Sequence, residues 1–144
     1  MPMCADSQSS LFLEGEGDAW FARNPENLSA PADSPDISFI CSTLQSFSHE
    51  ISSILEIGCG GGAKVSLLSK YFQSDGYGID PSKQAIKTAT EIASPSEIKL
   101  AFQTGVATQL PYEDNKFDLV FFGFCLYLVP QMRYSRRSWR RIGC

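Results

Sequence analysis

Two carboxylates and a glycine-rich stretch have the residue types and the spacing to bind a ligand. Glu56 comes shortly before the run Gly-Cys-Gly-Gly-Gly at 58–62, and Asp80 follows further along. Glycines let the backbone turn sharply and let a ligand approach without a Cβ in the way. Free amides at the start of a helix would point toward that ligand, and an acid about 20 residues further on suits the two hydroxyls of a ribose. The pattern therefore predicts a site for a cofactor that contains a nucleoside.

The glycine-rich stretch alone fits more than one kind of cofactor. Residues 58–63 also satisfy the dinucleotide fingerprint G-x-G-x-x-G/A, which leaves a nicotinamide cofactor open as an alternative. A phosphate-binding P-loop is excluded, because it needs glycine before its lysine and Ser or Thr after it, whereas Lys64 stands between Ala63 and Val65. Glu56 would repel a pyrophosphate and would suit a ligand with an ammonium or sulfonium group.

The glycine-rich stretch needs a strand before it and a helix after it. Ile54, Leu55 and Ile57 make a short apolar run, typical of a strand buried on both faces. The following helix would bury one apolar stripe, made of Val65, Leu68 and Phe72. A second strand, at 77–79, then ends in Asp80. Because parallel strands end at one edge of a sheet, the loop and the acid should meet there.

The remaining segments complete an α/β fold with a mostly parallel sheet. Ser82 would cap a helix that runs to about Ala93, with an inner face made of Ala85, Ile86, Ala89 and Ile92. Alternating apolar residues at 98–103 predict an edge strand, and the apolar run at 117–122 predicts an interior strand. Right-handed crossovers give the strand order 3-2-1-4, and the cleft should open between strands one and four.

Two further helices are predicted before the first strand. Asp18 would cap a short helix from Ala19 to Asn24, which would either form a lid over the cofactor or pack on the edge of the sheet. Asp36 would cap a longer helix to about Phe47. Its inner face would consist of Ile37, Ile40, Cys41, Leu44 and Phe47.

Three segments resemble the motifs of class I S-adenosylmethionine-dependent methyltransferases. Residues 55–62 (LEIGCGGG) resemble the first motif, 78–82 (GIDPS) the second, and 110–120 (LPYEDNKFDLV) the stretch before the fourth strand. The resemblance covers roughly 18–129. It implies a three-layer Rossmann-like sandwich that binds S-adenosylmethionine.

The resemblance also implies a role for each site residue. Gly58, Cys59 and Gly60 would pass under the methionine part and the ribose, and Glu56 would act on the amino end, directly or through water. Gly62 would allow close helix packing. The other cofactor-binding residues would be Asp80 on the ribose, Pro81 against the adenine, Val106 and Ala107 at the adenine edge through backbone groups, and Gly123 on the methyl-transfer side with Phe124.

Two departures from the family pattern bear on an adenine contact of the cofactor and on the substrate. Val106 and Thr108 stand where family members usually have an acid for the adenine amino group. The residues after the fourth strand, Gly123 and Phe124, do not form the Asn-Pro-Pro-Tyr or Asp-Pro-Pro-Tyr signature of enzymes that methylate bases, which favours a small-molecule acceptor. Since a sulfonium is already activated, alignment and desolvation can supply most of the catalysis, and no catalytic residue is assigned.

Composition and charge bound the remaining possibilities. The 144-residue chain is 43% hydrophobic, which is ordinary for one globular domain, and its five scattered cysteines predict neither a disulfide framework nor a metal site. With no signal peptide or membrane span, we expect a cytoplasmic protein that does not act on membranes. All 16 acids lie in residues 1–132, giving that part a net charge of −9, so a nucleic acid partner is not expected.

The last segment, 130–144, is atypical because it carries five arginines and no acid. It suggests a truncated or frame-shifted end after about residue 129, or else an arginine-rich anion-binding tail. We therefore divide the chain into a flexible segment with a possible lid helix, 1–35, a partial methyltransferase domain, 36–129, and this tail. The C-terminal strands of the family fold would be missing, so the fourth strand would be open to a partner or to self-association. A cofactor-binding protein without catalytic activity remains the alternative to an enzyme.

Overall fold

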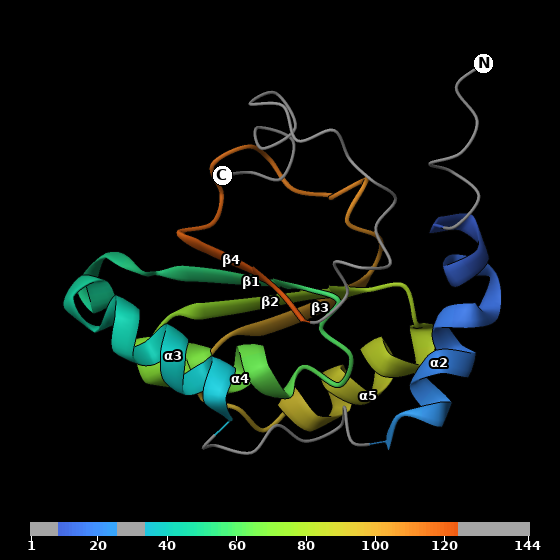
Figure 1. Ribbon diagram of the computed structural model, residues 1–144, viewed down its shortest axis with the longest axis horizontal. Coiled ribbons are helices and arrows are strands. Elements are labelled where there is room, and N and C mark those ends of the chain that lie inside the picture. The colour runs from blue at the N-terminus through green and yellow to red at the C-terminus, as the bar shows by residue number, and fades with distance from the viewer. Residues whose placement is uncertain (1–8, 26–33, 124–144) are drawn as a thin grey trace.

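A single parallel sheet organises the chain. The computed structural model describes residues 9–25 and 34–123 (Figure 1). Its four strands, in the order β3-β2-β1-β4, are all parallel, as predicted. They are β1 (Ser53–Ile57), β2 (Asp75–Asp80), β3 (Leu100–Thr104) and β4 (Leu119–Phe122). Phe124 and the basic tail lie outside the described residues.

Three helices cover one face of this sheet, as Figure 1 shows. They are α3 (Pro35–Leu44), α4 (Ala63–Phe72) and α5 (Lys83–Ala93), and the 3₁₀ segment η3 (Gln45–Glu50) joins α3 to β1. Successive right-handed crossovers that step outward in one direction place α4 and α5 on the same side. Among residues 9–25 and 34–123, no helix lies on the other face of the sheet, where the third layer of the sandwich is predicted. No helix within 9–25 or 34–123 is long and apolar enough to cross a membrane.

The main core lies between the sheet and the helices α3 and α4. Ile54 of β1 packs there with the predicted stripe of α4, and the fully buried or nearly buried members are Ile37, Ile51, Ile54, Val65, Leu68 and Phe72. The prediction that Phe47 and Ile92 face inward is wrong, because these residues are 52% and 57% exposed. Phe47 falls in η3, where the change of helix type turns it outward. In α5 the predicted inner-face residues Ala85 and Ala89 are confirmed, since both are buried.

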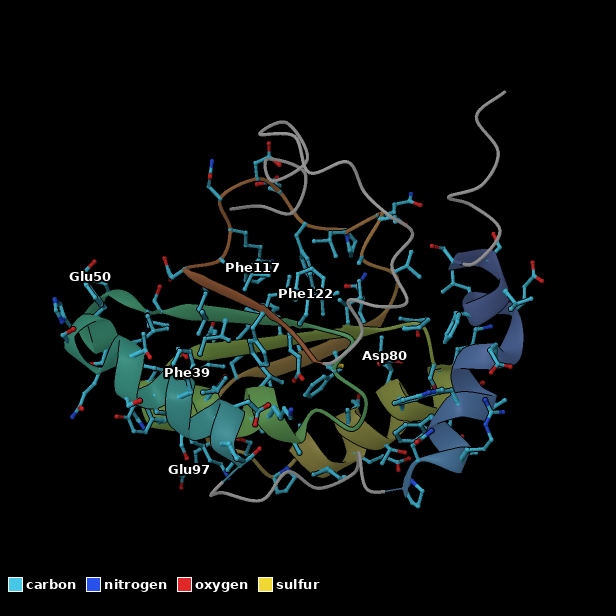
Figure 2. All side chains as sticks on the ribbon, viewed as in Figure 1. Phe39, Glu50, Asp80, Glu97, Phe117 and Phe122 are labelled. Atoms are coloured by element: carbon cyan, nitrogen blue, oxygen red, sulfur yellow. The ribbon has the colours of Figure 1, made fainter. Side chains whose placement is uncertain are left out.

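The opposite face is covered by the connection between β3 and β4, residues 105–118. Phe117 is buried there with Leu55, Ile57 and Ile79, and Figure 2 shows Phe117 and Phe122 on this side of the sheet. Three rings, those of Tyr77, Tyr112 and Phe117, meet edge to face. The Lys116 ammonium lies 4.8, 4.9 and 5.6 Å from their centroids. Cation–π attraction therefore helps to hold this connection on the sheet.

The helical segment within residues 9–25 is longer than predicted, and Asp18 does not cap it. It consists of a π-helical turn η1 (Phe12–Glu16) and α2 (Gly17–Arg23). Asp18 lies inside α2 and does not cap it; its carboxylate instead accepts hydrogen bonds at the start of α5. Asp36 also lies inside its helix, because α3 begins at Pro35 with Ser34 as the N-cap residue. Proline suits the first helical position, since its missing N–H would have no partner there.

Asp118 fixes the starts of β1 and β4 relative to each other. Its Oδ2 accepts hydrogen bonds from the amide and the hydroxyl of both Ser52 and Ser53, at 2.8–3.0 Å. These bonds lower the pKa of the Asp118 carboxyl, the largest effect being that of the Ser52 hydroxyl. The charged Asp118 carboxylate therefore holds β1 and β4 together at the amino-terminal end of the sheet.

We expect Asp118→Ala to lower the free energy of unfolding by about 1–2 kcal/mol, because several charge-assisted bonds are lost but their exposed donors can bind water instead. Urea unfolding at neutral pH measures the change. Asp114→Ala, which removes an exposed acid from the same connection, is the matched control and should stay close to the parent. Equal stability of the two variants would contradict the role assigned to Asp118.

Candidate functional site

The glycine loop between β1 and α4 is bound to the end of β2. The amides of Gly58 and Cys59 both donate to the Ile79 carbonyl, at 2.8 and 3.1 Å. The next amide, that of Gly60, donates to Asp80 Oδ2 at 2.9 Å. The structure thus brings the loop and the acid together at one edge of the sheet, as their spacing predicts.

Three glycines of this loop have positive φ angles: 75° at Gly58, 51° at Gly60 and 76° at Gly62. Such angles favour glycine over any residue with a side chain. Gly62 also has a packing role, because a Cβ there would lie 2.5 Å from the ring of Phe102. Gly62 therefore lets α4 begin close to β3 and α5, in line with the packing role predicted for it.

The Asp80 carboxylate has a backbone donor on each oxygen. Gly60 donates to Oδ2, and the Ser82 amide donates to Oδ1 at 2.9 Å. Burial raises the pKa of Asp80, and these two hydrogen bonds oppose the rise. Figure 2 shows Asp80 at the end of β2, near the start of α5. The sequence analysis missed this structural part of its role, in which the acid ties the glycine loop to the next helix.

Glu56 is buried beneath the loop, on the helix side of β1. It is 2% exposed, and its Oε2 accepts a hydrogen bond of 3.1 Å from the Val65 amide in the first turn of α4. Burial raises the pKa of Glu56 to about 8, against the lowering effects of the Val65 bond and of Lys64. The side chain therefore satisfies a helix amide that would otherwise lack a partner.

Gly123 meets the glycine loop from the end of β4. Its amide donates to the Ile57 carbonyl at 2.8 Å. A Cβ at this position would lie 2.3 Å from the Gly58 carbonyl oxygen and 2.5 Å from Glu56 Oε1. Only a residue without a side chain fits at this contact, so Gly123 is packed directly against the loop and the buried acid.

The segment after β3 lies beside the end of β2. The Gly105 amide donates to the Asp80 carbonyl at 3.0 Å, and Val106 pairs with Gln109 in a tight turn. Ala107 packs against the core of the second face. Pro81 lies on the other side of Asp80, where its carbonyl carbon is close to Gly17 of α2. Backbone groups of this turn are thus near the site, and residues 105–109 hold no acid.

Two long-range contacts of the site left no signal in the sequence. Asp18 accepts from the Ser82 hydroxyl, and Lys64 pairs with Asp36. The partners are 64 and 28 residues apart, so no local pattern connects them. Asp18 does cap a helix, but the helix is α5 and not its own. Asp36 lies in the first turn of α3, and its carboxylate pairs with Lys64 of α4. In the ranges 9–25 and 34–123, no three His, Cys, Asp or Glu side chains gather as a metal site.

The fold and the site define a Rossmann-like domain of the class I methyltransferase type. The family model described as "Methyltransferase domain" matches residues 55–143, so the chain belongs to this family, whose class uses S-adenosylmethionine. The matched range extends past Val129, where the resemblance found from the sequence ends.

Two curated relatives agree with this assignment, and one solved structure shares the fold. Ajmaline N-methyltransferase from Rauvolfia serpentina is 36% identical over 61% of this chain and 31% of its own length. Demethylmenaquinone methyltransferase from Staphylococcus aureus is 37% identical over 61% and 37%. A SAM-dependent methyltransferase from Aquifex aeolicus shares the fold, with a TM-score of 0.57 at 19% identity over 71% of this chain and 57% of that one. The chain spans about a third of the length of the curated relatives it matches.

We expect Glu56 to make stability depend on pH. Its pKa rises from the ordinary 4.5 to about 8 on folding, so the folded state keeps a proton that the unfolded state loses in this window. The free energy of unfolding should therefore fall as the pH rises from about 4.5 to about 8, by at most about 1.4 kcal/mol per pH unit. Glu56→Gln should lack this contribution.

Urea unfolding at pH 5, 6, 7 and 8 measures the difference between the parent and Glu56→Gln. The control is Glu50→Gln, because Glu50 is an exposed acid of η3. A difference between parent and Glu56→Gln that stays constant across the range would show that Glu56 titrates normally.

Proposed function

We propose that this chain binds S-adenosylmethionine at the glycine loop and takes part in methyl transfer to a small-molecule acceptor. The observation that supports this proposal most directly is the hydrogen bond between Asp80 and Gly60. This bond joins the two parts of the cofactor site predicted from the sequence. In this proposal Asp80 accepts the ribose hydroxyls with its remaining lone pairs. Gly58, Cys59 and Gly60 pass under the ribose and methionine part.

We propose the remaining cofactor contacts from the positions of the residues at the carboxyl ends of the strands. Pro81 lies against the adenine, and the backbone of Val106 and Ala107 frames its edge. Glu56 is buried beneath Gly58, so we propose that it acts on the amino end of the cofactor through water or through the position of the loop. We place Gly123 on the methyl-transfer side, where its lack of a side chain lets the end of β4 pack against Gly58 and Glu56.

When bound, the cofactor would supply a methyl group on an activated sulfonium: the carbon–sulfur bond would break as the acceptor atom bonds to the carbon, its electron pair would stay on sulfur, and a proton released by the acceptor would pass to water. The protein must align the acceptor and exclude water, so we assign no general base. The two curated relatives are named for ajmaline and for demethylmenaquinone, which supports a small-molecule acceptor rather than a nucleic acid.

A cofactor-binding protein without turnover is the second candidate. It is the alternative to an enzyme named above, and no catalytic residue is assigned among residues 9–25 and 34–123. Incubation with methyl-labelled cofactor and a panel of amine, hydroxyl and quinol acceptors separates the two candidates. Labelled product from this chain alone would exclude the second one.

We also propose that the outer edge of β4 pairs with another strand, from a partner or from a second copy of the chain. Among the described strands, β4 pairs with β1 alone, and an unpaired edge is a template for strand addition. Light scattering after size exclusion tests self-association, and pull-down with a candidate partner tests the other case. We further propose a cytoplasmic location, which cell fractionation would test.

We expect Asp80→Ala to weaken S-adenosylmethionine binding by about 30- to 150-fold, because two charge-assisted bonds to the ribose would be lost. Calorimetric titration measures the dissociation constant. Asp75→Ala is the matched control, since Asp75 stands at the opposite end of the same strand and should leave binding unchanged. Because Asp80 also holds Gly60 and Ser82, the melting temperature of each variant is measured alongside.

Titration with NAD distinguishes the cofactors. Tight NAD binding without a response to S-adenosylmethionine would overturn the proposal in favour of a nicotinamide enzyme. Equal affinity of Asp80→Ala and the parent for S-adenosylmethionine would remove the ribose role from Asp80.

A further inference from the structure

Helix α2 is docked on the start of α5 by one carboxylate. Asp18 Oδ1 accepts a hydrogen bond of 2.6 Å from the Ser82 hydroxyl and one of 2.9 Å from the Gln84 amide. The Ser82 hydroxyl in turn accepts from the Ala85 amide at 3.0 Å, which is the usual N-cap bond. Two residues thus share the capping of α5, and Asp18 comes from a segment far away in the sequence.

Backbone contact beside Asp18 leaves little freedom in how α2 sits. Gly17 is buried, and a Cβ on it would lie 3.0 Å from the Ser82 amide nitrogen, 3.1 Å from the Pro81 carbonyl carbon and 2.8 Å from the Phe12 carbonyl oxygen. A side chain at this position would therefore push α2 away from the turn. Gly17 sets the distance, and the Asp18 hydrogen bonds set the orientation.

The contacts continue from this turn into the cofactor site. The Ser82 amide donates to Asp80 Oδ1, and Asp80 Oδ2 accepts from Gly60, both at 2.9 Å. Ser82 is 1% exposed, so water cannot replace the hydrogen bonds of its hydroxyl. A continuous series of hydrogen bonds therefore runs from Asp18 through Ser82 and Asp80 to the glycine loop.

We propose that Asp18 is a positioning residue for the cofactor, which acts through Ser82 on the carboxylate of Asp80. The proposal rests on the proposed function, in which Asp80 holds the ribose. Docking of α2 would fix the Ser82 amide, and this amide would fix the plane of the Asp80 carboxylate. Undocking would release one oxygen of Asp80 and, through the other, the amide of Gly60.

A double-mutant cycle in S-adenosylmethionine affinity tests the proposal. We expect Asp18→Ala to raise the dissociation constant about 3- to 10-fold, a normal size for a residue that does not touch the ligand. In an Asp80→Ala background the same substitution should change the constant less than 2-fold, since the group it acts through is absent. An equal fold-change in both backgrounds, or none in either, would overturn the proposal.

Two further variants separate positioning from general stability. Asp18→Asn keeps an acceptor for Ser82 and Gln84 and should lie between the parent and Asp18→Ala. Arg23→Gln removes the exposed ion pair with Glu16 on the outer side of the same segment and should leave affinity unchanged. A loss of affinity in Arg23→Gln equal to that in Asp18→Ala would show that any destabilised α2 has the same effect, and would overturn the proposal.

Hydrogen exchange without ligand keeps the inference separate from the cofactor assignment. In Asp18→Ala the amides of Ser82 and Gly60 should exchange faster than in the parent, while the Gly123 amide, bonded to the Ile57 carbonyl, should not change. If the parent does not bind S-adenosylmethionine, the proposed function fails, and exchange alone decides this inference. Unchanged exchange at Ser82 and Gly60 would overturn it.

Discussion

The bonding of the glycine loop to the end of β2 is the constraint on which the site depends. Three successive amides, those of Gly58, Cys59 and Gly60, find their acceptors on Ile79 and Asp80. A loop held in this way needs positive φ angles at Gly58, Gly60 and Gly62, and it leaves the first turn of α4 directly above β1. The acid at the end of β2 is therefore both a part of the framework and the group that faces a ligand.

The buried acid of β1 follows from the same arrangement. Because the loop turns back over β2, the first turn of α4 presents its Val65 amide to the interior, and Glu56 is the acceptor it finds. A carboxyl at this depth holds its proton more firmly than in water, and its pKa is raised accordingly. Burial of the Glu56 carboxyl is unfavourable by itself, but it provides a hydrogen-bond acceptor for the Val65 amide in the first turn of α4.

Local patterns predicted the sheet order, the apolar stripe of α4, the Ser82 cap and the meeting of the loop with Asp80. These features depend on periodicity and on chain direction, which one sequence contains. The partners of Asp18 and Asp36 could not be found in this way, since an acid at a helix start fits its own helix as well as a distant one. The exposure of Phe47 and Ile92 was missed for a similar reason: helix type and tilt decide which side of an apolar stripe reaches the core.

The ring of Phe102 lies against two of the motif glycines at once. A Cβ on Gly62 would lie 2.5 Å from this ring, and a Cβ on Gly78 would lie 2.6 Å from it. These three positions, on a loop and two strands, therefore cannot drift independently during evolution. A methyl group at position 78 would also lie 2.7 Å from Cys59 Sγ, so both Phe102 and Cys59 would have to shift or become smaller to admit it. Position 62 would still be restricted by its backbone angle. The order in which neutral changes can accumulate at this edge of the sheet is therefore set by Phe102 and Cys59 together.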